Sequence, residues 1–135
     1  MYEHGGPIVM VQIENEFGGY ADYAGEENKA DPEYLPWLRD LTKAVGVNEL
    51  LFTCDAAWDL PKYFMPELWI GLEGGLWTVN FKNEANRWLT ILAELQPDMP
   101  VMVMEWWTGW FDYWGIEHQT WDADEFKKEL TDILG

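Results

Sequence analysis

Two glutamates stand where apolar runs of the sequence end. Glu16 lies in the stretch QIENEFG, which follows the apolar run IVMV, and Glu105 directly follows the apolar run VMVM. Asn15 precedes Glu16, and tryptophans stand just after Glu105. Two carboxyl groups at one site can act as acid, base or nucleophile when their surroundings separate their pKa values. The sequence therefore offers a candidate carboxyl pair at the ends of two separate strands.

Cleavage of a glycosidic bond is a reaction that needs such a pair. One carboxylic acid protonates the leaving oxygen, and the other carboxylate attacks the anomeric carbon or activates a water molecule. Trp106, Trp107 and Trp110 would supply a low dielectric and a face on which a sugar ring packs. A single glutamate is usually a solvated surface group, so this interpretation of Glu16 and Glu105 depends on their motif context.

The elements that must position these residues alternate between strand and helix. Apolar runs predict buried strands over 8–13, 50–54, 76–81 and 101–104. Apolar spacings of three and four predict helices over 31–45 and 83–95, a last helix from Asp122 to Leu134, and a weaker one over 60–64. In the first helix, Asp31 is the predicted N-cap, Pro32 takes the first helical position, and Gly46 is the predicted C-cap.

This order of elements predicts four βα units in one α/β domain over residues 1–135, with parallel strands and right-handed crossovers. Each predicted strand ends in polar residues, and in parallel α/β folds sites lie at the C-terminal ends of strands. Strands also end in polar residues merely because they reach solvent. For two of these residues, Asp55 and Asn80, we expect loop stabilisation more than contact with a substrate.

The composition restricts the partners. The 135 residues carry a net charge of -17, which disfavours nucleic acid and anionic membrane surfaces but is compatible with a neutral sugar. Ten tryptophans serve either as core residues or as stacking platforms. Cys54 is the only cysteine and is predicted to be a small buried apolar residue. His4 and His118 lack ligand spacing, so no metal site and no cofactor is expected.

The N-terminal stretch MYEHGGPIVMVQ lacks the basic and long apolar regions of a signal peptide. No run of about 20 apolar residues predicts a membrane span. As written, the chain would be made in the cytosol, and its compartment is otherwise undetermined.

Two motifs carry a family resemblance. GGPIVMVQIENEFGGY resembles the first signature of the family 35 glycoside hydrolases, the β-galactosidases, and MVMEWWTGWFDYWG resembles the second. LLFTCDA and GLWTVNF are similar to the strands between them. The resemblance implies a (β/α)8 (TIM) barrel of which this chain spans only units four to seven, a half-barrel.

The same resemblance implies roles for individual residues. Glu16 would be the acid/base, Glu105 the nucleophile, and Asn15 a contact to the hydroxyl beside the anomeric carbon. Trp110 would line the galactose site, and Glu14 would be structural. The implied reaction is the cleavage of terminal β-galactosides with retention, which places the two carboxyl groups roughly 5 to 5.5 Å apart.

Several alternatives stay open. With half a barrel absent, activity would be weak, and the uncovered strand edges predict a homo-oligomer, a dimer or higher. The chain could instead be a non-catalytic sugar-binding or folding fragment, from a natural truncation or an engineered half-barrel. It could also act on a β-glucoside or a β-fucoside. A flavodoxin-like three-layer sheet is the alternative fold.

Overall fold

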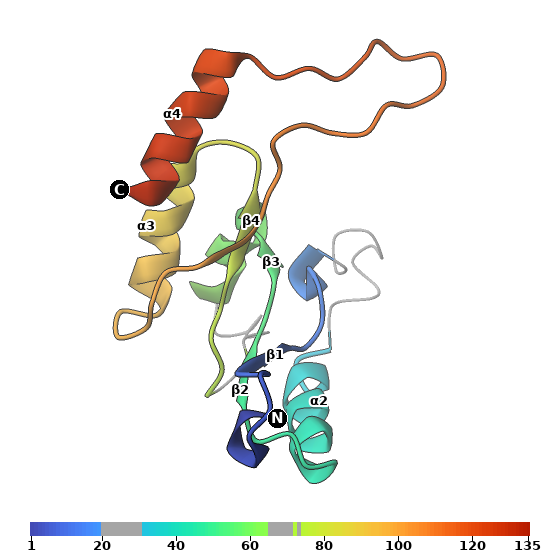
Figure 1. The fold of residues 1–135 in the computed structure, drawn as a ribbon, viewed down its shortest axis with the longest axis vertical. Helices are drawn as coiled ribbons and strands as arrows, with labels where there is room; N and C mark the ends of the chain where they lie inside the picture. Colours follow the sequence, from blue (N-terminus) through green and yellow to red (C-terminus); the bar gives the residue numbers. More distant parts are fainter. Residues whose placement is uncertain (20–30, 65–71, 73) are drawn as a thin grey trace.

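The computed structural model of the chain describes residues 1–19, 31–64, 72 and 74–135. Strands and helices alternate along it, except that β3 directly follows β2 (Figure 1). The strands are β1 (Met10–Gln12), β2 (Leu50–Phe52), β3 (Asp55–Ala56), β4 (Val79–Phe81) and β5 (Val103–Trp106). The α-helices are α2 (Tyr34–Ala44), α3 (Ala85–Leu95) and α4 (Ala123–Leu134), and the 3-10 helices are η1 (Tyr2–His4) and η2 (Ala57–Phe64).

All strand pairs in the described part are parallel. β1 pairs with β2, and β3, β4 and β5 pair in that order. A parallel bridge between Phe52 and Leu76 joins the two sheets, and only Thr53 and Cys54 separate β2 from β3. Neighbours in space therefore follow the order of the chain, as right-handed βα units require. The predicted α/β class with parallel strands is confirmed.

The core lies between the sheet and the helices that follow its strands. On α3, Ala85, Trp88 and Leu92 recur at spacings of three and four and form its buried face. They pack in one cluster with Val79 and Phe81 of β4, which are almost completely buried. α4 packs beside α3 (Figure 1). The middle strand β4 is thus fixed from both edges and from one face.

The ends of α2 differ in part from the prediction. The helix begins at Tyr34 with Glu33 as its N-cap, so the prediction of Asp31 as cap and Pro32 as first helical residue is wrong. The Asp31 carboxylate instead accepts a hydrogen bond from the backbone N–H of Glu33 at 2.9 Å and forms a turn before the helix. At the other end the C-cap is Val45 and not the predicted Gly46, which follows it with φ 94° and donates its N–H to the carbonyl of Lys43.

The last strand and the last helix bear directly on the site. β5 covers 103–106 instead of 101–104, so Glu105 lies inside the strand and pairs with Asn80 of β4. The shift arises because the backbone of Trp107 continues the ladder by donating to the carbonyl of Phe81 at 2.9 Å. Residues 107–122 then form a long connection that leaves the body of the molecule before α4 (Figure 1). Asp122, at which the last helix was predicted to begin, is the N-cap of α4 and accepts from the N–H groups of Asp124 and Glu125.

Candidate active site

Glu16 is held beside the sheet by the segment that follows β1. The N–H of Ile13 donates to the carbonyl of Phe52 at 2.9 Å, and the N–H of Glu16 donates to the carbonyl of Cys54 at 2.6 Å. Between these bonds Glu14 has φ 66°, and Glu16 itself has φ 54°. Left-handed backbone is uncommon for residues other than glycine and costs of order 1–3 kcal/mol. Tertiary contacts therefore hold this segment in a conformation that its residue types do not favour.

Asn80 of β4 connects the two glutamates. Its side chain is fully buried. The Nδ2 group donates to Oε1 of Glu16 at 3.1 Å, and Oδ1 accepts from the backbone N–H of Glu105 at 3.1 Å. Glu16 and Glu105, far apart in the sequence, thus contact opposite ends of one amide.

The carboxylate of Glu105 has its own partners. Oε2 accepts from the indole Nε1–H of Trp107 at 2.9 Å, and Oε1 lies 3.5 Å from Sγ of Cys54. Glu105 as a whole is half-buried. A bond from an N–H to a carboxylate is strong and directional, and it fixes the orientation of the carboxyl plane.

Cys54 completes the cluster and stays a neutral thiol. Its Sγ lies 3.1 Å from Oδ1 of Asn80. Burial is the main cause that raises the pKa of the Cys54 thiol to about 12; the hydrogen bond to Asn80 opposes the rise, and the nearby Glu105 carboxylate adds to it. The prediction of a buried residue is confirmed, but Cys54 is also a polar contact of the site.

The other two predicted site residues lie less close to this cluster. The side chain of Asn15 is exposed, and its Oδ1 accepts from Nε2 of Gln12 at 3.2 Å. Gln12 also donates to the carbonyl of Glu14 at 2.8 Å, which holds the turn together. Trp110 is 47% exposed, and its ring centroid lies 5.6 Å from that of Trp107, which in turn donates to Glu105.

Sequence reasoning underestimated three residues. It assigned Asn80 to loop stabilisation, whereas Asn80 contacts both glutamates. It treated Cys54 as apolar and did not single out Trp58, whose ring lies 5.5 Å from that of Trp107. The usable signal was the position of Asn80 and Cys54 at strand ends. Asp55, the residue after Cys54, accepts a hydrogen bond at Oδ2 from the hydroxyl of Thr53.

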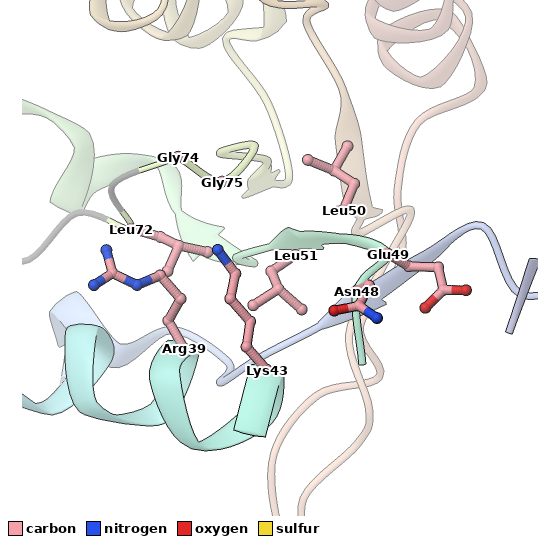
Figure 2. Close-up of a pocket in the computed structure, with 9 residues that line it drawn as sticks. All are labelled: Arg39, Lys43, Asn48, Glu49, Leu50, Leu51, Leu72, Gly74 and Gly75. Carbon is pink, nitrogen blue, oxygen red and sulfur yellow. The ribbon is translucent and has the colours of Figure 1, made fainter. Parts of the chain in front are cut away.

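Two surface pockets lie away from this cluster. One, of about 230 Å³, is at the opposite end of β2, where Arg39 and Lys43 of α2 face Asn48, Leu51 and the Gly74–Gly75 turn (Figure 2). The other, of about 340 Å³, lies between the end of β4 and α4 and is lined by Lys82, Trp121 and Glu129 among others. Neither is lined by Glu16 or Glu105.

Metal ligands and membrane spans can be assessed only for the described ranges. In those ranges, no group of three or more histidine, cysteine, aspartate or glutamate side chains is arranged so that it could hold a metal ion. His118 instead pairs with Asp112 at 2.7 Å. Across the same ranges, no helix combines the length and the apolar character needed to cross a membrane.

The whole chain matches a known family. Residues 1–135 fit the profile of the glycosyl hydrolases family 35. The chain is 38% identical to beta-galactosidase-1-like protein 2 of Homo sapiens over 98% of this chain and 19% of that protein. It is 38% identical to a beta-galactosidase of Xanthomonas manihotis (97% of this chain, 20% of that protein) and 34% identical to one of Felis catus (99% and 19%). It spans about a fifth of the length of these relatives.

Proposed function

Because the chain belongs to the glycosyl hydrolases family 35, we propose that it carries the catalytic carboxyl pair of a retaining β-galactosidase-like glycoside hydrolase. Glu16 is the acid/base and Glu105 the nucleophile. The observation that carries this proposal is the single amide of Asn80, which contacts the side chain of Glu16 and the backbone of Glu105. Glu16, in the segment after β1, and Glu105, on β5, share this one buried side chain, which supports their action on the same bond.

The reaction has two steps. In the first, a carboxylate oxygen of Glu105 forms a bond to the anomeric carbon, the glycosidic C–O bond breaks, and Glu16 gives its proton to the leaving oxygen. In the second, a water oxygen attacks the anomeric carbon, Glu16 takes the proton of that water, and the bond to Glu105 breaks. Two inversions give net retention at the anomeric carbon.

The neighbouring side chains have supporting roles. The Trp107 indole N–H occupies Oε2 of Glu105 and orients the carboxylate for attack. Asn15, exposed at the turn, contacts the hydroxyl beside the anomeric carbon. Trp110 offers a ring face to the galactose, on which the C–H side of the sugar packs.

We also propose that the fold of this chain corresponds to units four to seven of a (β/α)8 barrel. Parallel strands that pair in chain order support it, with a helix as the next element after β1, β3, β4 and β5. The 135 residues correspond to about a fifth of the length of the relatives, and contacts with a sugar also position it for reaction, so we expect low activity from these residues by themselves. The outer edges of β1 and β5 support association with further copies of the chain.

A second candidate function is a sugar-binding or folding segment without turnover. The observation that favours it is length, because the chain spans about a fifth of its curated relatives. Binding energy that positions a substrate is part of catalysis. A segment that retains the carboxyl pair but lacks this binding energy would bind a sugar weakly and not cleave it.

Hydrolysis of aryl β-glycosides tests the two functions. Wild type, Glu16→Gln and Glu105→Gln are compared on β-galactoside, β-glucoside and β-fucoside substrates. Glu14→Gln is the matched control, because Glu14 lies in the same turn and also has a left-handed φ. We expect each catalytic variant to lose about 10²- to 10⁴-fold in kcat, and the control to keep its rate. A fluorinated galactoside that traps the glycosyl-enzyme should label Glu105.

Equal residual rates in all four proteins would show that a contaminating enzyme hydrolyses the substrate and would contradict the catalytic assignment. A change in tryptophan fluorescence on adding galactose, without turnover, would favour the binding segment. Preference for the glucoside or fucoside would assign another sugar to the same carboxyl pair.

A further inference from the structure

We propose that Asn80 is a positioning residue that sets both members of the carboxyl pair, with its Nδ2 group acting on the side chain of Glu16 and its Oδ1 atom acting on the backbone of Glu105. This inference rests on the proposed function. It adds that one rigid amide fixes the acid/base relative to the nucleophile. A double displacement requires the two carboxyl groups to lie roughly 5 to 5.5 Å apart.

The hydrogen bonds determine which way the Asn80 amide points. The backbone N–H of Glu105 can only donate, so the atom that faces it, 3.1 Å away, must be the oxygen. The nitrogen then faces Oε1 of Glu16 at 3.1 Å as a donor. A side chain with a donor and an acceptor on one rigid plane is needed here. Aspartate lacks the donor, and leucine lacks both.

The position of Asn80 in the sheet explains why it can serve both sides. β4 lies between β3 and β5, and Asn80 pairs with Ala56 on one side and with Glu105 on the other. An irregularity in the register between Val79 and Asn80 occurs where the ladder to β5 begins to include Glu105. Such irregularities redirect side chains next to active sites.

Burial makes the arrangement stiff. Asn80 is fully buried, and an amide in that environment is destabilising unless its polar atoms are bonded. The bonds that satisfy it are those to Glu16, Glu105 and Cys54. The Cys54 thiol, 3.1 Å from Oδ1, gives this oxygen a second donor and restrains rotation of the amide. A shift of Asn80 would therefore move both glutamates together.

Thr78, which directly precedes β4, is a matched control position for Asn80. It is fully buried, lies two residues before Asn80, and donates through Oγ1 to the carbonyl of Thr53 at 2.7 Å. Within the described part of the chain, the hydrogen bonds of Thr78 go to Thr53 and Asp55 and to neither glutamate. Thr78→Val keeps the shape of the side chain and removes one buried hydrogen bond. It therefore measures how much stability is lost when a buried hydrogen bond outside the site is removed.

The kinetic test uses Asn80→Asp, Asn80→Leu and Thr78→Val on β-galactosides with good and poor leaving groups. Asn80→Asp keeps the acceptor for Glu105 and loses the donor to Glu16, so we expect about a tenfold loss of kcat with a methyl galactoside and a smaller loss with a dinitrophenyl galactoside. Asn80→Leu should lose activity with both. Thr78→Val should lower thermal stability and leave kcat per folded molecule unchanged. Equal leaving-group dependence in Asn80→Asp and wild type would overturn the proposal.

An NMR measurement tests the same bridge without turnover. In the ¹H–¹⁵N spectrum, the Asn80 side-chain amide should shift in Glu16→Gln and keep its wild-type position in Glu14→Gln. The backbone amide of Glu105 should shift in Asn80→Leu more than in Asn80→Asp. If these chemical-shift changes are absent, the bridge through Asn80 is contradicted, whether or not the protein is active. If the chemical-shift changes are present but neither the wild type nor any variant hydrolyses a galactoside, the bridge is supported and the proposed function is contradicted.

Discussion

The indole Nε1–H of Trp107 donates to Oε2 of Glu105 at 2.9 Å, and the two residues are only two positions apart on the chain. Trp106, between them, points elsewhere and donates its Nε1–H to the carbonyl of Lys82 at 3.1 Å. Alternate side chains of a strand face opposite sides of the sheet. The two adjacent tryptophans therefore serve different purposes, one at the carboxyl pair and one in the packing against α4.

This relationship predicts the outcome of two matched substitutions. Trp107→Phe keeps an aromatic ring but removes the donor to the Glu105 carboxylate. A hydrogen bond to a charged group contributes about 1.5–3 kcal/mol, so kcat on a β-galactoside should fall by about 10- to 100-fold. Trp106→Phe should lower the thermal midpoint and leave kcat per folded molecule near that of wild type. A similar kcat loss in both variants would show that Trp107 has no specific role at Glu105.

Cys54 predicts an unreactive thiol. Because burial raises its pKa to about 12, the folded protein should react with iodoacetamide at pH 8 far more slowly than the unfolded chain. The thiolate forms near pH 9.0 in the unfolded chain and only near 12 in the fold. The contribution of Cys54 to stability is thus complete below pH 9.0 and is lost as the pH rises toward 12.

Unfolding in urea between pH 8 and 11 checks this sign, with Cys54→Ser as the control. The wild type should lose more stability than the variant across this range. Fast labelling of the folded wild type at pH 8 would contradict the burial of the thiol.

Much of the α/β order followed from apolar periodicity, because buried strands and amphipathic helices leave strong local signals. Ala85, Trp88 and Leu92 are such a case on α3. The residue at which a helix begins was harder to predict. Asp31 and Pro32 fit an N-terminus by residue type, yet the Asp31 side chain forms a turn and the helix starts at Tyr34.

The site was harder to predict than the fold, since its contacts join residues distant in sequence. Motif resemblance singled out Glu16 and Glu105, but the role of Asn80 depends on the register between β4 and β5. That register is set by tertiary bonds such as the one from Trp107 to Phe81. The left-handed φ of Glu16 likewise has no signal in its residue type, because glycine would be expected at such a position.

The cap of α4 predicts a stability change. Asp122 accepts from the N–H of Asp124 at 2.8 Å and of Glu125 at 3.4 Å. Asp122→Ala removes this cap and should lower the free energy of unfolding by about 1 kcal/mol, as measured in urea. Asp122→Ser keeps an acceptor and should recover most of the loss. No change in Asp122→Ala would mean that the first turn of α4 contributes nothing to stability.

The connection between β5 and α4 predicts a pH effect. The backbone N–H of Gln119 donates to Oδ1 of Asp112 and the ring of His118 contacts Oδ2, and these contacts lower the pKa of Asp112. A carboxyl group with a lowered pKa stabilises its surroundings at higher pH, and this effect is lost as the pH falls through its folded value. The connection, which carries Trp110 and Trp114, should therefore loosen at acidic pH.

Tryptophan fluorescence against pH measures this loosening. Asp112→Asn keeps an acceptor for Gln119 and cannot titrate, so its acidic transition should be smaller than that of the wild type. Identical transitions in the two proteins would assign the change to other carboxyl groups.

The sheet edges predict self-association. In the described part, β1 pairs only with β2 and β5 only with β4, and such edges can pair with another chain. Ile8 and Val9, just before β1, are exposed by 46% and 60%. The net charge of -17 opposes association at low salt, so added salt should favour it.

Light scattering at micromolar concentration tests this expectation. The wild type should have a mass that is a multiple of 15.8 kDa, and the multiple should rise with salt. Val9→Lys places a charge beside the edge of β1 and should shift the mass toward one chain. Thermal unfolding of the variant checks that its fold is intact. A wild-type mass of one chain at every salt concentration would contradict the expected oligomer.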